Sequence, residues 1–328
     1  MRPTMRIFVT RSLPGDAVGR LAREHEVDLW HGDMPPPYGE LAARCARADG
    51  IICLLTDRID AQLIESAPQL RVISNVAVGY DNVDIAAATA RGIPVGNTPG
   101  VLTEATADLT FALLLACARH IVDAERFVRD GRWRTWDPGL LLGMELRGAT
   151  LGIVGYGQIG RAVARRAAGF GMRVMYATRD EAAARNGDDP MPVHLDALLR
   201  ESDIVSLHVP LSGTTRHLIG EQQLRAMKPS AILINTARGP VVDQPALARA
   251  LHEGWIAAAG VDVTEVEPIP MNDALLAAPN LTILPHIGSA THTTRERMAA
   301  MAVDNALAGV RGARLPHCVN PEVYGRKG

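Results

Sequence analysis

The stretch LGIVGYGQIGRAVARR, residues 151–166, decides the fold class of this chain. An apolar run leads into three glycines with GxGxxG spacing, and a helical pattern follows them. Gly155 permits a tight turn, Gly157 lets the backbone approach a pyrophosphate, and Gly160 lets the helix pack against the strand. The first turn of the helix offers N–H groups and a favourable dipole to phosphates. The spacing alone also fits a glycine turn without a ligand, but a preceding strand and a following helix are the context that a dinucleotide site requires.

The composition indicates a globular protein with a small partner. With 328 residues the chain exceeds the roughly 250–300 residues at which one core stops growing, so two domains are expected. A hydrophobic fraction of 47% supports large cores. The net charge of −2 and the absence of a basic tract argue against nucleic acid or a membrane surface as the main partner.

The cysteines and the apolar runs suggest a cytoplasmic protein. The cysteines have neither CxxC spacing nor a neighbouring histidine pair, so we expect reduced thiols and no metal site. The N-terminus lacks an apolar segment long enough for a signal peptide. The longest apolar run, 109–118, is shorter than the roughly 20 residues of a membrane helix. The four cysteines are Cys45, Cys53, Cys117 and Cys318.

Short strand-like runs alternate with helical patterns along the whole chain, which is typical of parallel α/β architecture. We therefore predict two Rossmann-like or flavodoxin-like parallel-sheet domains. The expected strands before the glycine motif are 6–10, 27–30, 50–55, 70–76 and 93–97. Those after it are 173–178, 203–209, 231–236, 257–263 and 281–287.

The helical pattern of residues 103–131 predicts one long helix, with Thr103 as its N-cap and Gly131 just past its end. Apolar side chains surround its axis, so it is expected either between domains or in an interface between copies. The segment after it carries Trp133 and Trp136 in a turn-rich context. We favour a protruding arm that contacts a second copy over a buried loop.

The end of the strand after the glycine motif bears on the choice of dinucleotide. An NAD site usually has an acidic residue there, whereas an arginine accommodates the 2′-phosphate of NADP. This chain has Thr178 and Arg179, which favours NADP(H). Asp180 weakens that preference, so NAD(H) stays possible, and a surface arginine is the alternative interpretation.

Three reactive side chains follow three later strands: Arg238, Glu267 and His286. Ligands bind at the carboxyl ends of parallel strands, so the three are expected to converge. Reduction of a 2-oxo acid needs a cation for the carboxylate, a proton donor beside the carbonyl oxygen, and a carboxylate that favours the charged donor. Each residue alone is more often structural, but together after a dinucleotide fold they indicate a dehydrogenase.

Five strings in this order resemble the D-isomer-specific 2-hydroxyacid dehydrogenases, and among them the glyoxylate/hydroxypyruvate reductases. The resemblance extends from the first strand to residue 307. It implies that Arg238, Glu267 and His286 are the catalytic residues and that the substrate is a small 2-oxo acid, first glyoxylate or hydroxypyruvate. The strings are VGYDNVD (78–84), GYGQIG (155–160), NTARGPVVD (235–243), AAAGVDVTEVEPIP (257–270) and LPHIGSAT (284–291).

The resemblance also implies a domain division. A substrate-binding domain comprises 1–101 and 288–328, and an NAD(P)-binding Rossmann domain, 102–287, is inserted in it. The backbone N–H groups of Val78 and Gly79 are expected to bind the substrate carboxylate opposite Arg238. His286 and Ser289 are the further expected substrate contacts. A homodimer through residues 103–145 is implied as well.

Cofactor contacts are implied along the whole Rossmann domain, with Asp262 at the position that holds the nicotinamide carboxamide. His208 is expected to line the cofactor groove or to be structural, and His292 to lie at a helix start without an assigned role. The expected cofactor contacts are Thr106, Gly155, Gly157, Gln158, Ile159, Gly160, Thr178, Arg179, Pro210, Thr215, Thr236, Ala237, Arg238, Asp262, His286 and Gly288.

Two alternatives stay open from the sequence. One is an NAD-linked dehydrogenase for another D-2-hydroxy acid, such as phosphoglycerate or lactate. The other is a dinucleotide-sensing binding protein, since relatives of this fold act as corepressors. The chain keeps all three reactive residues, which favours the enzyme over the sensor.

Overall fold

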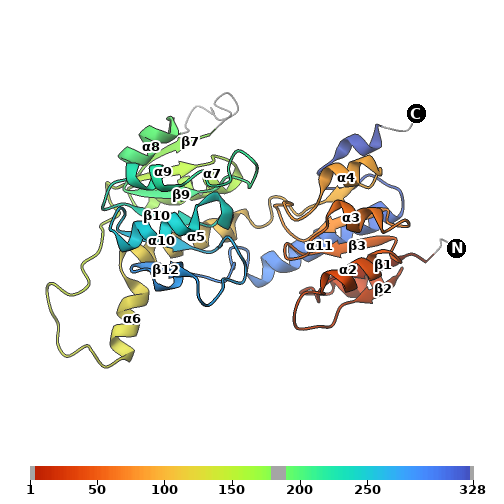
Figure 1. Cartoon of the computed structure of the whole chain (residues 1–328), viewed down its shortest axis with the longest axis horizontal. Helices are drawn as coiled ribbons and strands as arrows, with labels where there is room; N and C mark the ends of the chain where they lie inside the picture. The colour runs from red at the N-terminus through yellow and green to blue at the C-terminus, as the bar shows by residue number, and fades with distance from the viewer. Residues whose placement is uncertain (1–3, 179–189, 326–328) are drawn as a thin grey trace. The chain divides into compact units, whose positions relative to one another are not determined.

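The computed structural model describes residues 4–178 and 190–325, and the chain divides into two compact units (Figure 1). The first unit comprises Met1–Leu102 and Ser289–Gly328, and the second comprises Thr103–Gly288. The first unit is therefore built from both ends of the chain, and the second is inserted into it.

The first unit contains a five-stranded sheet in the order β2-β1-β3-β4-β5, with every pair parallel. β3 and β4 are buried on both faces, as expected of parallel strands covered by helices. Each of the five expected strand runs overlaps one of these strands, and only β2 begins outside its run, one residue early at Glu26, so this part of the prediction is confirmed. The strands are β1 (Arg6–Val9), β2 (Glu26–Leu29), β3 (Gly50–Cys53), β4 (Val72–Asn75) and β5 (Val95–Gly96).

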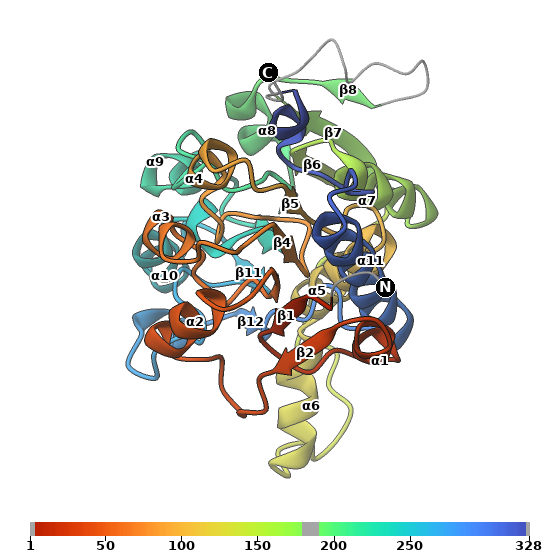
Figure 2. The same cartoon turned by 90° about the vertical axis from the view of Figure 1, so that its right-hand side faces the viewer.

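Helices cover both faces of this sheet (Figure 2). On one face lie α1 (Ala17–Ala22) and the long C-terminal helix α11 (His292–Val310). His292 is thus the first residue of α11, at the helix start as expected. The other face is covered by α2 (Tyr38–Cys45), α3 (Ala61–Glu65) and α4 (Ile85–Ala90), and a short 3-10 helix, η3 (Pro321–Tyr324), follows α11.

The second unit contains a seven-stranded parallel sheet in the order β12-β11-β10-β9-β6-β7-β8. The chain runs from β6 to β7 on one side and then crosses to β9 on the other side of β6. This reversal creates a switch point at the carboxyl ends of β6 and β9, where open α/β sheets bind ligands. The strands are β6 (Thr150–Val154), β7 (Arg173–Ala177), β8 (Met191–Pro192), β9 (Ile204–Leu207), β10 (Ile232–Asn235), β11 (Ala258–Val261) and β12 (Leu281–Ile283).

Two helices, α5 (Thr103–Ala118) and α7 (Gln158–Gly169), cover one face of the second sheet. Arg166 of α7 joins them through ion pairs to Glu104 (2.8 Å) and Asp108 (2.6 Å) of α5. The opposite face carries α8 (Leu195–Glu201), α9 (Glu221–Ala226) and α10 (Gln244–His252), with two 3-10 helices, η1 (Gly239–Val241) and η2 (Ala274–Ala277), in the connections. The predicted fold class of two parallel α/β domains is confirmed.

The expected single helix over 103–131 is wrong. The chain forms α5 and then α6 (Ile121–Arg129), which are bent by 61° at a break where His120 has a left-handed backbone (φ 49°). The helix also begins at Thr103 itself, so this residue is not its N-cap. The break has a physical reason, because the Ala118 carbonyl accepts a hydrogen bond from the Met144 N–H (2.8 Å) of the returning chain.

The segment after α6 is exposed, as the predicted arm requires. Trp133, Trp136 and Leu142 are 59%, 77% and 73% exposed, and Figures 1 and 2 both show α6 and this segment projecting from the second unit. The alternative of a buried loop is therefore wrong.

Among the described residues, no single helix is both long enough and apolar enough to cross a membrane. Only α5 and α6 taken together, which are bent at their junction, meet both criteria.

Candidate active site

The glycine motif forms the turn between β6 and α7, and each glycine meets a different environment. Gly155 has φ 95°, and a Cβ on it would lie 2.7 Å from the carbonyl carbon of His208. A Cβ on Gly160 would lie 2.3 Å from the Gly155 oxygen, because the helix packs closely on the strand. A Cβ on Gly157 would meet nothing within 4 Å. Two glycines are thus required by the fold, while a side chain at the third would enter open space.

The start of α7 suits the pyrophosphate of a dinucleotide. Gly157 is the N-cap and provides no side-chain cap, so the first-turn N–H groups keep their capacity for an anion. Gly157 and Gln158 are exposed, and Ile159 is half-buried. The open space at Gly157 and this uncapped helix start fit the cofactor that the sequence predicts.

The residues expected to select NADP are only partly described. β7 ends at Ala177, and Thr178 follows it half-buried. Arg179 and Asp180 lie outside the described residues. The expected contact of Arg179 with the 2′-phosphate therefore stays a prediction from the sequence.

His286 and Glu267 form a hydrogen-bonded pair. His286 Nδ1 lies 2.7 Å from Glu267 Oε2, and the other oxygen, Oε1, accepts from the Thr264 N–H at 3.1 Å. Because a carboxylate only accepts, Nδ1 carries the proton and Nε2 points to other partners. Among the described residues Nε2 has no hydrogen bond, and the side chains are 24% and 28% exposed, so a ligand can reach the pair.

Asp262 holds the turn that carries His286. His286 has φ 55°, and its N–H donates to the Asp262 carbonyl at 2.9 Å. The N–H groups of Ile287 and Gly288 donate to the two carboxylate oxygens of Asp262, both at 2.7 Å. Burial raises the pKa of Asp262, while these N–H groups and His286 act in the opposite direction. Sequence reasoning assigned Asp262 only to the cofactor and missed this turn.

Arg238 lies on a loop that a buried asparagine fixes. The side chain of Asn235, at the end of β10, accepts from the Ala237 N–H at 3.0 Å and donates to the Arg238 carbonyl at 2.9 Å. The Arg238 guanidinium donates to the Ala237 carbonyl at 2.9 Å. Sequence reasoning missed Asn235, although an asparagine at a strand end is a known signal for such a turn.

The three strands that carry these residues are neighbours. β10 pairs with β11 and β11 with β12, all parallel, so Arg238, Glu267 and His286 follow the carboxyl ends of adjacent strands. The structure brings Glu267 and His286 into direct contact. Arg238 follows β10, and one strand, β11, lies between β10 and the strand β12 that precedes His286. Charged side chains at such an edge can stabilise the negative charge of a carboxylate and the charge that develops on a carbonyl oxygen.

Two threonines expected to contact the cofactor lie in the interior. The Thr236 hydroxyl lies 2.9 Å from the Thr110 hydroxyl, which also donates to the Thr106 carbonyl at 2.8 Å. Thr106 is buried, and a Cβ on Gly288 would approach its Cγ2 to 3.6 Å. These residues therefore join the start of α5 to the ends of β10 and β12.

The loop after β9 is fixed by its own side chains. Thr215 is buried, and its hydroxyl donates to the Pro210 carbonyl at 2.7 Å and accepts from the Ser212 N–H at 2.8 Å. His208 Nε2 lies 2.8 Å from the Ser206 hydroxyl. Burial lowers the pKa of His208 to about 3, so this histidine is neutral and does not act as an acid.

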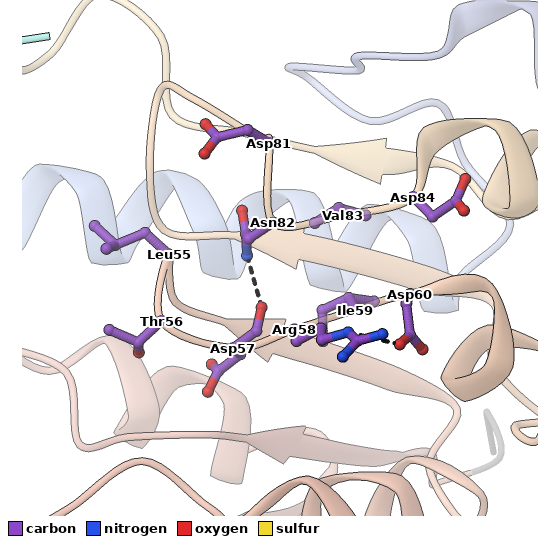
Figure 3. A pocket seen from close by; sticks show the side chains of 10 residues that line it. All are labelled: Leu55, Thr56, Asp57, Arg58, Ile59, Asp60, Asp81, Asn82, Val83 and Asp84. Carbon is purple, nitrogen blue, oxygen red and sulfur yellow. Dashed lines mark hydrogen bonds and ion pairs between the residues drawn. The ribbon is translucent and has the colours of Figure 1, made fainter. Parts of the chain in front are cut away.

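In the first unit, asparagines fix the turn that carries Val78 and Gly79. Asn97 donates to the Val78 carbonyl at 2.9 Å, and Asn75 to the Gly79 carbonyl at 3.0 Å. Asn82 donates to the Asp57 carbonyl at 3.0 Å, as Figure 3 shows beside a cavity of about 420 Å³ lined by residues 55–60 and 81–84. The expected substrate contact Ser289 is half-buried.

No metal cluster is found in residues 4–178 and 190–325, where no three His, Cys, Asp or Glu side chains are grouped for one ion.

A family model describing the NAD-binding domain of D-isomer specific 2-hydroxyacid dehydrogenases matches residues 111–288. The chain belongs to this family. The glyoxylate reductase of Korarchaeum cryptofilum is 52% identical to this dehydrogenase over 327 residues, which cover 98% of this chain and 97% of that one. The family and the fold inferred from the sequence are thus confirmed.

Solved structures agree with this membership. The TT0316 protein of Thermus thermophilus superposes on the dehydrogenase with a TM-score of 0.90 at 51% identity, covering 96% of this chain and 100% of that one. An NADPH-dependent glyoxylate/hydroxypyruvate reductase of Sinorhizobium meliloti, solved with NADP and malonate, gives a TM-score of 0.86 at 36% identity and covers 97% of each chain. The protein is an NAD(P)-dependent dehydrogenase, and its cofactor is a nicotinamide dinucleotide.

Proposed function

We propose that this dehydrogenase is an NADPH-preferring reductase of small 2-oxo acids, which converts glyoxylate to glycolate and hydroxypyruvate to D-glycerate. The observation that carries the proposal is the 2.7 Å contact between His286 Nδ1 and Glu267 Oε2 at the carboxyl ends of adjacent strands. The relatives named glyoxylate reductase support the substrate class.

His286 is the proposed proton donor. Its Nε2 gives a proton to the substrate oxygen as negative charge develops there, and takes it back in the reverse reaction. Glu267 completes the acid/base pair, because it accepts a hydrogen bond from Nδ1 and so directs Nε2 toward the substrate. A bound nicotinamide supplies the hydride.

Arg238 is the proposed carboxylate clamp. A guanidinium binds a carboxylate through two parallel hydrogen bonds, which fixes the direction of the neighbouring carbonyl. The loop held by Asn235 keeps the backbone of Arg238 in place for this role. We also propose that the N–H groups of Val78 and Gly79 bind the substrate carboxylate and that Ser289 contacts the substrate.

The glycine turn and the surrounding residues are the proposed cofactor site. The N–H groups at the start of α7 hold the pyrophosphate, with Gly157 leaving room for it. The loops at 210–215 and 236–238, together with the turn held by Asp262, are proposed to line the nicotinamide half.

Arg179 is the proposed source of NADPH preference. Its guanidinium is expected to pair with the 2′-phosphate, and the S. meliloti relative was solved with NADP. Replacing Arg179 with alanine should raise the KM for NADPH far more than that for NADH. A wild-type enzyme that uses NADH better than NADPH would contradict this assignment.

One assay tests the proposed reaction. The absorbance of NADPH and of NADH is followed with glyoxylate, hydroxypyruvate, pyruvate and phosphohydroxypyruvate as substrates. We expect the highest kcat/KM with NADPH and one of the first two. Preference for another acid would favour an NAD-linked dehydrogenase of a different D-2-hydroxy acid, and no turnover with any of them would favour a dinucleotide sensor.

We propose that the protein is a homodimer through residues 103–145 and that it works in the cytoplasm. The exposed Trp136 and Leu142 support the interface, since apolar side chains on a projecting arm bury surface when a second copy covers them. The four cysteines form no disulfide, as expected in a reducing compartment. Light scattering on wild type and on Trp136→Glu should show a dimer and a weakened dimer, respectively.

A further inference from the structure

The residue after the arginine clamp, Gly239, touches the backbone of another loop. A Cβ on Gly239 would lie 1.9 Å from both the carbonyl carbon and the oxygen of Thr264, and 2.5 Å from the Glu265 nitrogen. Such distances are far inside van der Waals contact, so any side chain must displace one of the two backbones. The contacted atoms belong to the main chain, so they cannot rotate out of the way as the end of a flexible side chain can.

The contacted peptide belongs to the turn that orients the acid/base pair. The N–H of Thr264 donates to Glu267 Oε1 at 3.1 Å, and the Thr264 hydroxyl donates to the Val266 carbonyl at 2.8 Å. Glu267 Oε2 in turn contacts His286 Nδ1 at 2.7 Å. A movement of the Thr264 peptide therefore moves the carboxylate that holds the imidazole.

The turn is tied in place from its other side. The Glu265 N–H donates to Gln244 Oε1 at 2.9 Å, and Glu265 Oε1 accepts from the Gln244 N–H at 3.2 Å. The same oxygen lies 2.7 Å from His217 Nε2. Moving the turn away from Gly239 would strain these contacts.

The loop on the Gly239 side is equally restrained. The Arg238 carbonyl accepts from the Asn235 side chain at 2.9 Å and from the Val241 N–H at 3.2 Å. Neither backbone can yield without breaking hydrogen bonds, so the Gly239 contact determines the separation of the two loops.

We propose that Gly239 is a positioning residue that couples the substrate clamp to the proton donor. It sets the distance between the loop of Arg238 and the turn of Glu267, and through Glu267 it fixes the direction of His286. The proposal rests on the proposed function for the roles of Arg238 and His286. It adds a residue that acts through the positions of Arg238 and Glu267.

The test replaces Gly239 with alanine in the full-length protein. Gly169→Ala is the matched control, because a Cβ there meets nothing within 4 Å and Gly169 is exposed at the end of α7. We expect Gly239→Ala to lower kcat about 100-fold, the loss typical of a misplacement near 1 Å.

Two measurements separate positioning from general damage. The NADPH dissociation constant, followed by fluorescence, should stay within about threefold of wild type, which corresponds to less than 1 kcal/mol. In protein labelled with ¹⁵N-histidine, the Nδ1–H signal of His286, assigned by its loss in His286→Gln, should shift or disappear in Gly239→Ala. The control, Gly169→Ala, should retain both kcat and the His286 signal.

The outcomes decide the proposal. It is overturned if Gly239→Ala keeps kcat within about twofold, or if it loses kcat with the His286 signal unchanged. If Gly239→Ala does not fold, Gln244→Ala is tested instead, because it loosens the same turn without adding a Cβ. The His286 signal should then shift or disappear in Gln244→Ala, and an unchanged signal overturns the proposal. If the wild type reduces no 2-oxo acid, the proposed function fails, while the histidine signal still decides the role of Gly239.

Discussion

His286 has a left-handed backbone, which is unfavourable for a residue with a Cβ. Such a conformation costs of order 1–3 kcal/mol and persists only when its surroundings impose it. The surroundings here are the hydrogen bonds from His286, Ile287 and Gly288 to Asp262. The backbone of His286 is thus set by Asp262 and its ring by Glu267, so the imidazole is oriented before a substrate arrives.

Replacing His286 with glutamine tests the proton donor. We expect kcat to fall by about 10²–10⁴-fold, the usual contribution of a positioned acid or base. NADPH affinity, measured by fluorescence titration, should change little, because the side chain acts on the substrate. His31→Gln, at an exposed histidine, is the control, and turnover near the wild-type rate in His286→Gln would refute the role.

His208 predicts a pH dependence of stability. Burial lowers its pKa from 6.5 to about 3, so the unfolded chain binds a proton at this site more readily than the folded one. Its contribution to stability is complete above pH 6.5 and is lost as the pH falls toward 3. At pH 5 the loss is about 2 kcal/mol. In His208→Gln the change in the free energy of unfolding between pH 7 and pH 5, from urea titrations, should be smaller by this amount; an unchanged difference would contradict it.

At the scale of elements, the ends of strands carry the site. Parallel strands bring their carboxyl ends to one edge, so residues far apart in the sequence meet there. Apolar runs flanked by turn residues predict nearly all of these strands, and the GxGxxG spacing predicts the turn formed by Gly155, Gly157 and Gly160. Local pattern is sufficient for the central strands β6, β9 and β10, because helices bury them on both faces.

The glycine turn gives a matched pair of variants. Gly157→Ala adds a Cβ in open space at an ordinary φ of −83°, so the melting temperature should not change. NADPH binding should weaken at least about tenfold, because the Cβ occupies the space of the pyrophosphate. Gly155→Ala combines a φ of 95° with a backbone clash, so it should lower the melting temperature. Calorimetry and fluorescence titration measure the two effects, and unchanged NADPH binding in Gly157→Ala would remove Gly157 from the cofactor site.

Other elements could not be predicted from local pattern. The break after α5 depends on Met144, which returns to the Ala118 carbonyl from a distant part of the chain. The contact of Gly239 with Thr264 and the turn held by Asp262 likewise arise between separate loops. The periodicity of hydrophobic residues indicates which face of a helix or strand is buried. It does not indicate which backbone groups of separate loops contact each other.

For the whole molecule, burial determines which thiols can react. Burial raises the pKa of Cys45 to about 12 and that of Cys117 to about 11, and it raises the pKa of Cys53 well above its ordinary value. All three are inaccessible, whereas Cys318 is partly exposed. The thiolate is the reactive form, so three of the four thiols should be inert in the native protein.

Titration with a chromogenic disulfide at pH 8 checks this expectation. The native protein should release the equivalent of one thiol, from Cys318, and the denatured protein the equivalent of four. Cys318→Ser should abolish the native reaction. Rapid release of two or more equivalents from the native wild type would show that a core containing cysteine opens readily.

The discontinuous first unit has a consequence for synthesis on the ribosome. The sheet of β1–β5 packs against α11. The side chain of Asn320, beyond α11, accepts from the Val95 N–H at 2.8 Å and donates to the Ile93 carbonyl at 3.0 Å. The N-terminal strands emerge first, yet they must wait for the last part of the nascent chain before their apolar face is covered. The strands of the second unit, Thr103–Gly288, all precede α11 in the chain, so this unit can complete its sheet earlier. Because domains generally fold as units, the second unit is expected to fold before the first, although translation of the first begins earlier.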